Sequence, residues 1–235
     1  MEYLVLAVVA GLAAVERKGF LQAMLSRPIA LAPLAGWALG DLRGGLLVAP
    51  PLELFWLGAV NLGAALPVHE ALGTAAIAGG AVLAARALGV PVSPDVALLA
   101  VLVCAPLALA GRKADRLVEI WNERLADRAE RQLAAGHPRA AVRCNVYGLA
   151  LPFAIAAVLA PLGAALAATL IPWLLRAAPA AAEPLQHGFF AFAALACASG
   201  AKALRARAAP GFFYAALGAA VAVSIAVALG RRLGT

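Results

Sequence analysis

The feature that most constrains this chain is its succession of long apolar runs, interrupted only by short charged or proline-rich stretches. Hydrophobic residues make up 64% of the 235 residues, and charged residues only 13%. A soluble protein of this length needs far more polar surface to cover its core. A membrane-spanning helix takes about 20 apolar residues, so with short loops the length allows about seven to nine membrane segments. The sequence therefore predicts an all-α, polytopic integral membrane protein.

The charged residues predict how the chain is divided and oriented. Lys and Arg outnumber Asp and Glu by 19 to 12, which in a membrane protein indicates loops held on the cytoplasmic side rather than nucleic-acid binding. The stretch 112–143 is amphipathic, with leucines at helical spacing on one side and charges on the other. We expect a membrane region at 1–111, a cytoplasmic amphipathic helix and loop at 112–143, and a second membrane region at 144–235. The amphipathic helix either lies solvated on the membrane surface or forms a docking surface for a soluble partner.

Several apolar segments are too short or too interrupted to cross a bilayer as straight helices. The run from Ile29 to Gly40 is brief, and the run from Gly44 to Leu66 carries Pro50, Pro51 and Glu53 near its middle. A proline pair should break a helix. The stretch Thr169–Gly200 also suggests helices that enter the membrane and turn back. The predicted fold is thus a helical bundle with broken or re-entrant helical hairpins, a feature that often marks a transporter's binding site.

Polar side chains in these apolar surroundings are the candidates for binding a ligand, because burying them in hydrocarbon is costly. Carboxylate and amide groups can accept hydrogen bonds from sugar hydroxyls, and amides can also donate to them. Glu53 could instead satisfy backbone donors freed by the predicted helix break, and Trp56 is more typical of packing than of sugar stacking. The candidate substrate-binding residues are Glu53, Asn61, His69 and Glu70, and the candidate structural or hinge residues are Pro50, Pro51, Gly40, Asp41, Gly58 and Gly63.

The sequence lacks the motifs of nucleotide, metal or nucleophile chemistry, so we expect no cofactor, no metal and no catalytic residue in this chain. A lipid-processing intramembrane enzyme is poorly supported for the same reason.

The order of short motifs near the start resembles a known family. The runs Arg27-Pro28-Ile29, Gly36 to Asp41, Leu52 to Gly58 and Asn61 to Pro67 resemble enzyme IIC of the mannose/fructose/sorbose-type phosphoenolpyruvate–sugar phosphotransferase system. The specific resemblance covers roughly residues 11–75.

The resemblance implies a sugar-translocating permease subunit in the bacterial cytoplasmic (inner) membrane, with Glu53 and Asn61 near a hexose-like sugar. It implies partnership with the membrane subunit IID and with soluble IIA and IIB, which carry the phosphoryl transfer. We also expect an oligomer embedded in the lipid bilayer, with no nucleic-acid partner.

One departure from the family pattern concerns the segment Pro67-Val68-His69-Glu70, where the family typically has aspartate at the position of His69. A histidine titrating near neutrality differs from a fixed carboxylate as a partner for hydroxyls. Three explanations stay open: Glu70 takes over the role, the substrate differs, or transport is impaired. The last leads to the alternative function, a degenerate IIC-like membrane subunit with a regulatory or scaffolding role.

Overall fold

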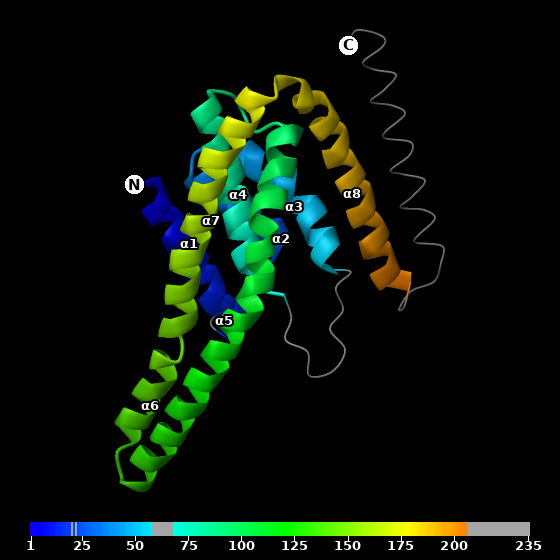
Figure 1. The fold of residues 1–235 in the computed structure, drawn as a ribbon. Helices are drawn as coiled ribbons and strands as arrows, with labels where there is room; N and C mark the ends of the chain where they lie inside the picture. The colour runs from blue at the N-terminus through cyan, green and yellow to red at the C-terminus, as the bar shows by residue number, and fades with distance from the viewer. Residues whose placement is uncertain (20, 22, 58–67, 206–235) are drawn as a thin grey trace.

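The computed structural model describes residues 1–19, 21, 23–57 and 68–205, and every regular element in this part is a helix. Figure 1 shows a bundle from which two helices extend at one end. The elements are α1 (Glu2–Lys18), α2 (Pro28–Ala38), α3 (Leu42–Leu57), α4 (Glu70–Leu88), α5 (Pro94–Ala134), α6 (Pro138–Tyr147), α7 (Ala150–Ala177), η1 (Pro179–Ala181) and α8 (Ala182–Arg205). The all-helical prediction is confirmed.

Helix α4 forms the centre of the bundle and packs against α7, α5, α2 and α1. Its residues from Ala71 to Ala85 are all buried. Small residues allow this close approach: a Cβ atom on Gly79 would lie 2.4 Å from the Leu6 side chain, and one on Gly80 would lie 2.7 Å from Ala167. In membranes, where water does not drive helices together, close packing of this kind holds a bundle.

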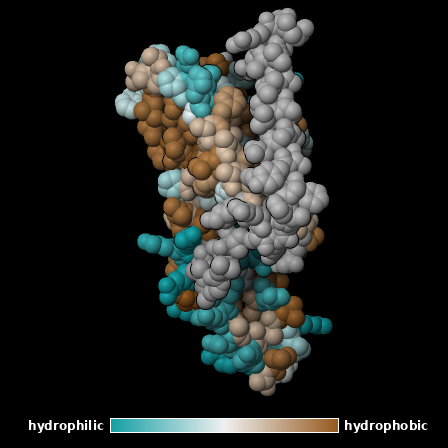
Figure 2. Space-filling model, turned by 90° about the vertical axis from the view of Figure 1, so that its right-hand side faces the viewer, coloured by the Kyte–Doolittle hydropathy of each residue, from teal (hydrophilic) through white to brown (hydrophobic). Residues whose placement is uncertain are grey.

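Three described segments are long and apolar enough to cross a membrane: Glu70–Leu88, Pro94–Ala134 and Pro138–Ala177. Figure 2 shows apolar side chains gathered over the middle of the bundle, with hydrophilic ones at its opposite end and over much of the extended end. The expected total of seven to nine crossings stays a prediction.

Helices α2 and α3 form a compact pair, here called the α2–α3 hairpin. Their 11 and 16 residues correspond to about 16 and 24 Å, less than the roughly 30 Å of the hydrocarbon core. Contact between them depends on glycine, because a Cβ atom on Gly45 would lie 2.4 Å from the Ala32 carbonyl oxygen. Both helices are thus shorter than a straight membrane crossing, and the expected re-entrance stays a prediction.

The prolines do not break the helices as the sequence suggested. Pro50 and Pro51 lie inside α3, and α7 continues through Pro161 and Pro172. Each proline removes one backbone donor and leaves the carbonyl four residues earlier without its usual partner, but the rest of the helix keeps its hydrogen bonds. Neighbouring helices stabilise such positions in a bundle.

The predicted amphipathic helix is the second half of α5. The 41 residues of α5 span about 60 Å, twice the hydrocarbon thickness, so its charged half projects along the helix axis. Its position at the membrane surface or against a soluble partner stays a prediction. The segment from Arg112 through α6 is here called the α5–α6 arm (Figure 1). The proposed domain boundary between residues 111 and 112 falls inside this continuous helix and stays a prediction.

Candidate functional site

An arginine bridges two of the predicted site carboxylates. The Arg27 guanidinium donates from Nε to Oε1 of Glu53 at 3.0 Å and from Nη1 to Oε1 of Glu70 at 3.1 Å. Nη2 makes a further contact with Glu53. These three residues, the Arg27 cluster, join α3 to α4 through the residue that precedes α2.

Helix starts contribute to the same cluster. Pro28 begins α2, a position where its missing N–H costs no helical hydrogen bond. The next backbone N–H, that of Ile29, donates to Oε2 of Glu53 at 3.1 Å, and Glu70 lies in the first turn of α4. Both carboxylates therefore lie at helix N-termini, where the helix dipole favours negative charge. Glu53 does satisfy a backbone donor, but one at the start of α2 rather than at a helix break in α3.

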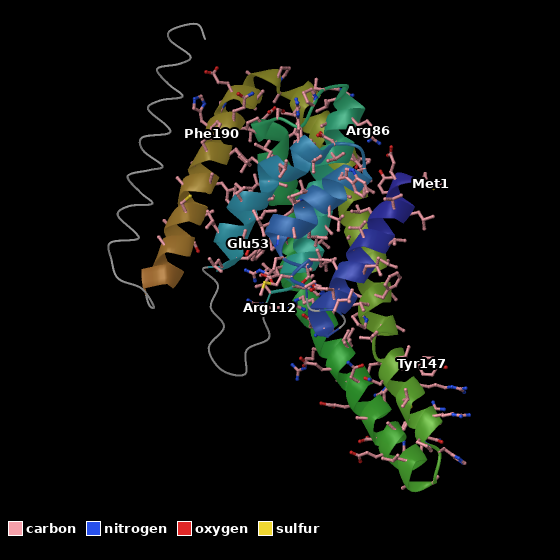
Figure 3. The ribbon with its side chains drawn as sticks, turned by 180° about the vertical axis from the view of Figure 1, so that it is seen from behind. Met1, Glu53, Arg86, Arg112, Tyr147 and Phe190 are labelled. Atoms are coloured by element: carbon pink, nitrogen blue, oxygen red, sulfur yellow. The ribbon has the colours of Figure 1, made fainter. Side chains whose placement is uncertain are left out.

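The Arg27 cluster is partly open. The side chains of Arg27, Glu53 and Glu70 are 30%, 19% and 20% exposed. Figure 3 shows Glu53 in the half of the bundle nearer the arm, with Arg86 and Met1 at the opposite end. Glu53 is thus paired with a cation and is not sealed in an apolar core. Asn61, Gly58 and Gly63 lie outside the described residues, in the segment 58–67 that directly follows α3.

Arg27 is the site residue that sequence reasoning missed. It is the only basic residue between Lys18 and Arg43. A lone cation among apolar residues needs a counter-ion, so this isolation was the available signal.

His69 is placed differently from the expectation of a titrating hydroxyl partner. It is the N-cap of α4: its Nδ1 accepts from the Leu72 N–H at 3.2 Å, and its own N–H donates to the Ala108 carbonyl at 3.1 Å. The residue as a whole is 3% exposed. Burial and the nearby positive charge of Arg17 lower the pKa of His69 to about 4. A neutral imidazole is what an Nδ1 acceptor requires.

A second ion cluster joins α1 to the base of the arm. Asp115, 2% exposed, pairs with Arg17 at 3.0 Å and with Lys18 at 2.8 Å. Next to them, Glu16 accepts from the Ser26 N–H at 2.9 Å. The charged triplet at the end of α1 is therefore held by partners, and Asp115 was hidden from sequence reasoning among the alternating charges of 112–143.

The remaining structural candidates lie at the far end of the α2–α3 hairpin. Gly40 has a φ of 88°, which favours glycine, and the Asp41 carboxylate accepts from the Gly44 N–H at 2.8 Å as α3 begins. Arg86 contacts the Leu39 carbonyl and Glu2 there. Trp56, 9% exposed, packs edge-to-face with Phe55 at a ring distance of 5.1 Å, so its ring serves packing as expected.

Comparison with known proteins gives consistent matches. The family profile described as "PTS system sorbose-specific iic component" matches residues 1–205. The "Putative N-acetylgalactosamine permease IIC component 2" of Escherichia coli (strain K12) is 42% identical over 86 residues, which is 37% of this chain. This match spans 58% of that relative, less than two thirds of its length.

Two solved structures have a similar fold. One, titled "Structure of membrane protein", has a TM-score of 0.69 at 23% identity and covers 99% of this chain and 94% of its own. The other is a cryo-electron microscopy structure of the mannose transporter ManYZ with microcin E492, with a TM-score of 0.59 at 22% identity, covering 99% of this chain and 93% of its own.

Proposed function

Because this chain belongs to the family of sorbose-specific IIC components of the phosphotransferase system, we propose that it is the sugar-translocating subunit of a mannose-type system. The resemblance noted from the sequence is confirmed, as is the prediction of a helical membrane protein. The family is one of membrane permease components, which fits a subunit without catalytic residues of its own. The proposed task is to bind a hexose-like sugar and present it for phosphorylation at the cytoplasmic side.

The observation that carries this proposal is the partly open Arg27 cluster. Two carboxylates and one guanidinium meet beside a helical hairpin too short to span the membrane. Carboxylates accept from sugar hydroxyls, and guanidinium N–H groups donate to them, with charge-assisted hydrogen bonds on both sides. Asn61, four residues beyond the end of α3, is proposed as an amide partner on the segment that follows.

The cluster also concerns position 69, where this chain has histidine and the family typically has aspartate. Glu70 contacts Arg27, whereas the His69 ring caps α4 in the packed interior. This geometry favours the explanation that Glu70 supplies the carboxylate. We therefore propose Glu53, Glu70 and Asn61 as sugar contacts, with His69 acting on them by fixing the start of α4.

The proposed setting follows from the family. The subunit works with IID in the bacterial cytoplasmic membrane as part of an oligomer, and soluble IIA and IIB carry the phosphoryl group. The positive-inside rule places the α5–α6 arm on the cytoplasmic face.

The test uses vesicles that contain the native chain, IID, IIA and IIB, and measures sugar binding and phosphoenolpyruvate-dependent uptake. Glu53→Gln keeps the shape but removes the charge, and losing hydrogen bonds to a charged group should weaken sugar binding about 10- to 100-fold. Glu123→Gln, at an exposed position on the arm, is the matched control and should leave binding unchanged.

Two results would count against the proposal in different ways. Unchanged binding and uptake in Glu53→Gln, with uptake present in the native protein, would refute the site. No sugar bound or taken up by the native protein with all its partners would refute transport and favour a degenerate regulatory or scaffolding subunit.

A further inference from the structure

An apolar hollow lies between α5 and α7 at the base of the arm. It has a volume of about 390 Å³ and is lined by Ala114, Leu117, Ala154, Ile155, Val158 and Leu159. This hollow is here called the α5–α7 groove. Leu117 and Val158 are 59% and 57% exposed, so the groove opens to the outside of the bundle rather than to its core.

The position of the groove along α5 corresponds to a membrane interface. A rise of 1.5 Å per residue places Leu117 about 35 Å from the start of α5 at Pro94, just beyond the roughly 30 Å of a hydrocarbon core. One turn further on, Trp121 donates from Nε1 to the Tyr147 carbonyl at 3.5 Å, and both aromatic rings are exposed. Tryptophan and tyrosine favour the headgroup level of a bilayer. With the start of α5 taken as the opposite membrane surface, the groove lies where acyl chains meet headgroups.

The side of α5 that forms the groove carries positive charge. Lys113 lies one turn before Leu117, and Arg124 lies two turns after it, so helical periodicity places all three on one side. Both cations are exposed, and neither takes part in an ion pair within the described residues. No Asp or Glu occupies the positions three, four or seven residues from Leu117 in either direction. The α5–α7 groove thus has two cations beside it that form no ion pair within the described residues.

We propose that the α5–α7 groove binds one anionic phospholipid of the leaflet on the side of the arm. An acyl chain occupies the apolar groove, and the phosphate lies between Lys113 and Arg124. The all-apolar lining suits a hydrocarbon chain, and basic residues immediately outside a membrane helix attract anionic headgroups. Lysine beside the groove can reach the headgroup level by extending its side chain toward water.

The test is native mass spectrometry of the full chain in mild detergent, titrated separately with phosphatidylglycerol and phosphatidylcholine of identical acyl chains. We expect one phosphatidylglycerol to be retained more tightly than phosphatidylcholine. The double variant Lys113→Gln/Arg124→Gln should weaken phosphatidylglycerol binding about thirtyfold, at roughly fivefold for each charge near the surface. Its phosphatidylcholine binding should not change.

Two further variants make the test selective. Arg131→Gln/Arg139→Gln removes two charges near the tip of the arm and should bind phosphatidylglycerol as the native protein does. Val158→Trp fills the groove and should reduce retention of both lipids, while the exposed position keeps the fold intact. Equal binding of the two lipids by the native protein, or an unchanged Lys113→Gln/Arg124→Gln variant, would overturn the proposal. Loss of a protein oligomer instead of lipid in Val158→Trp would identify the groove as a protein interface and overturn it as well.

Discussion

Substituting Arg27 tests the ion cluster on which the proposed site is built. Arg27→Gln removes the only cation among the described residues that contacts Glu53 and Glu70, and it leaves two partly buried carboxylates facing the same space. Removing one partner of a fully buried ion pair costs about 3–5 kcal/mol, whereas an exposed pair contributes about 0.2–1 kcal/mol. The side chains here are between one fifth and one third exposed. We expect a loss of about 2 kcal/mol, between these two cases.

A double-mutant cycle separates the ion bridge from other effects of the substitution. Glu70→Gln alone should cost about 1 kcal/mol, because Arg27 keeps its contacts with Glu53. In the Arg27→Gln background, Glu70→Gln removes the repulsion between the two carboxylates and should cost nothing or restore stability. The coupling between the two sites is then about 1 kcal/mol or more. Arg27→Lys should recover only part of the loss, since an ammonium cannot donate in two directions as the planar guanidinium does.

Thermal unfolding of the purified chain in detergent measures these differences. For a chain of this length, 2 kcal/mol corresponds to a fall in Tm of about 4–8 °C. Arg128→Gln, at an exposed arginine of the arm, is the control and should change stability by less than about 0.5 kcal/mol. A Tm for Arg27→Gln within 1 °C of the native value, or strict additivity in the cycle, would refute the reasoning.

Two further predictions concern the elements that hold the site. The pKa of His69 is about 4 in the folded chain and near 6.5 when unfolded, so the unfolded state binds more protons between these values. Stability should therefore fall by up to about 3 kcal/mol as the pH drops from 6.5 to 4. His69→Asn keeps a capping side chain without a titrating group, so the stability of this variant should change less between pH 6.5 and 4. An unchanged dependence of stability on pH would show that other groups cause the loss. Gly45→Val should separate α2 from α3, because its Cβ would lie 2.4 Å from the Ala32 carbonyl oxygen. We expect this variant to lose at least as much sugar binding as Glu53→Gln does. Sugar binding equal to that of the native protein would contradict the packing argument.

Several helix ends are set locally, by residues that act on their own neighbours. Prolines begin α2, α5 and α6, and Gly89 ends α4 in the left-handed conformation. The expected breaks at Pro50 and Pro51 were wrong for the opposite reason. Whether a proline ends a helix depends on what surrounds the carbonyl it leaves unpaired, and that information lies in other helices.

The candidate site was predictable in its residue types and only partly in its arrangement. Glu53 and Glu70 stood out because carboxylates are costly among apolar residues. That they share one arginine could not be read from the sequence, since Arg27 and Glu70 are separated by 43 positions. The same limit hid Asp115, whose burial depends on the end of α1 packing against α5.

The sequence by itself determined that this chain is a helical membrane protein, because the lengths of apolar runs act locally. Only the tertiary structure decided which charges meet and which helix ends they stabilise. It also joined the predicted amphipathic helix to the apolar half of α5 and placed His69 as the N-cap of α4. These outcomes depend on the packing of helices distant in sequence, where small residues permit contact and buried charges must find partners.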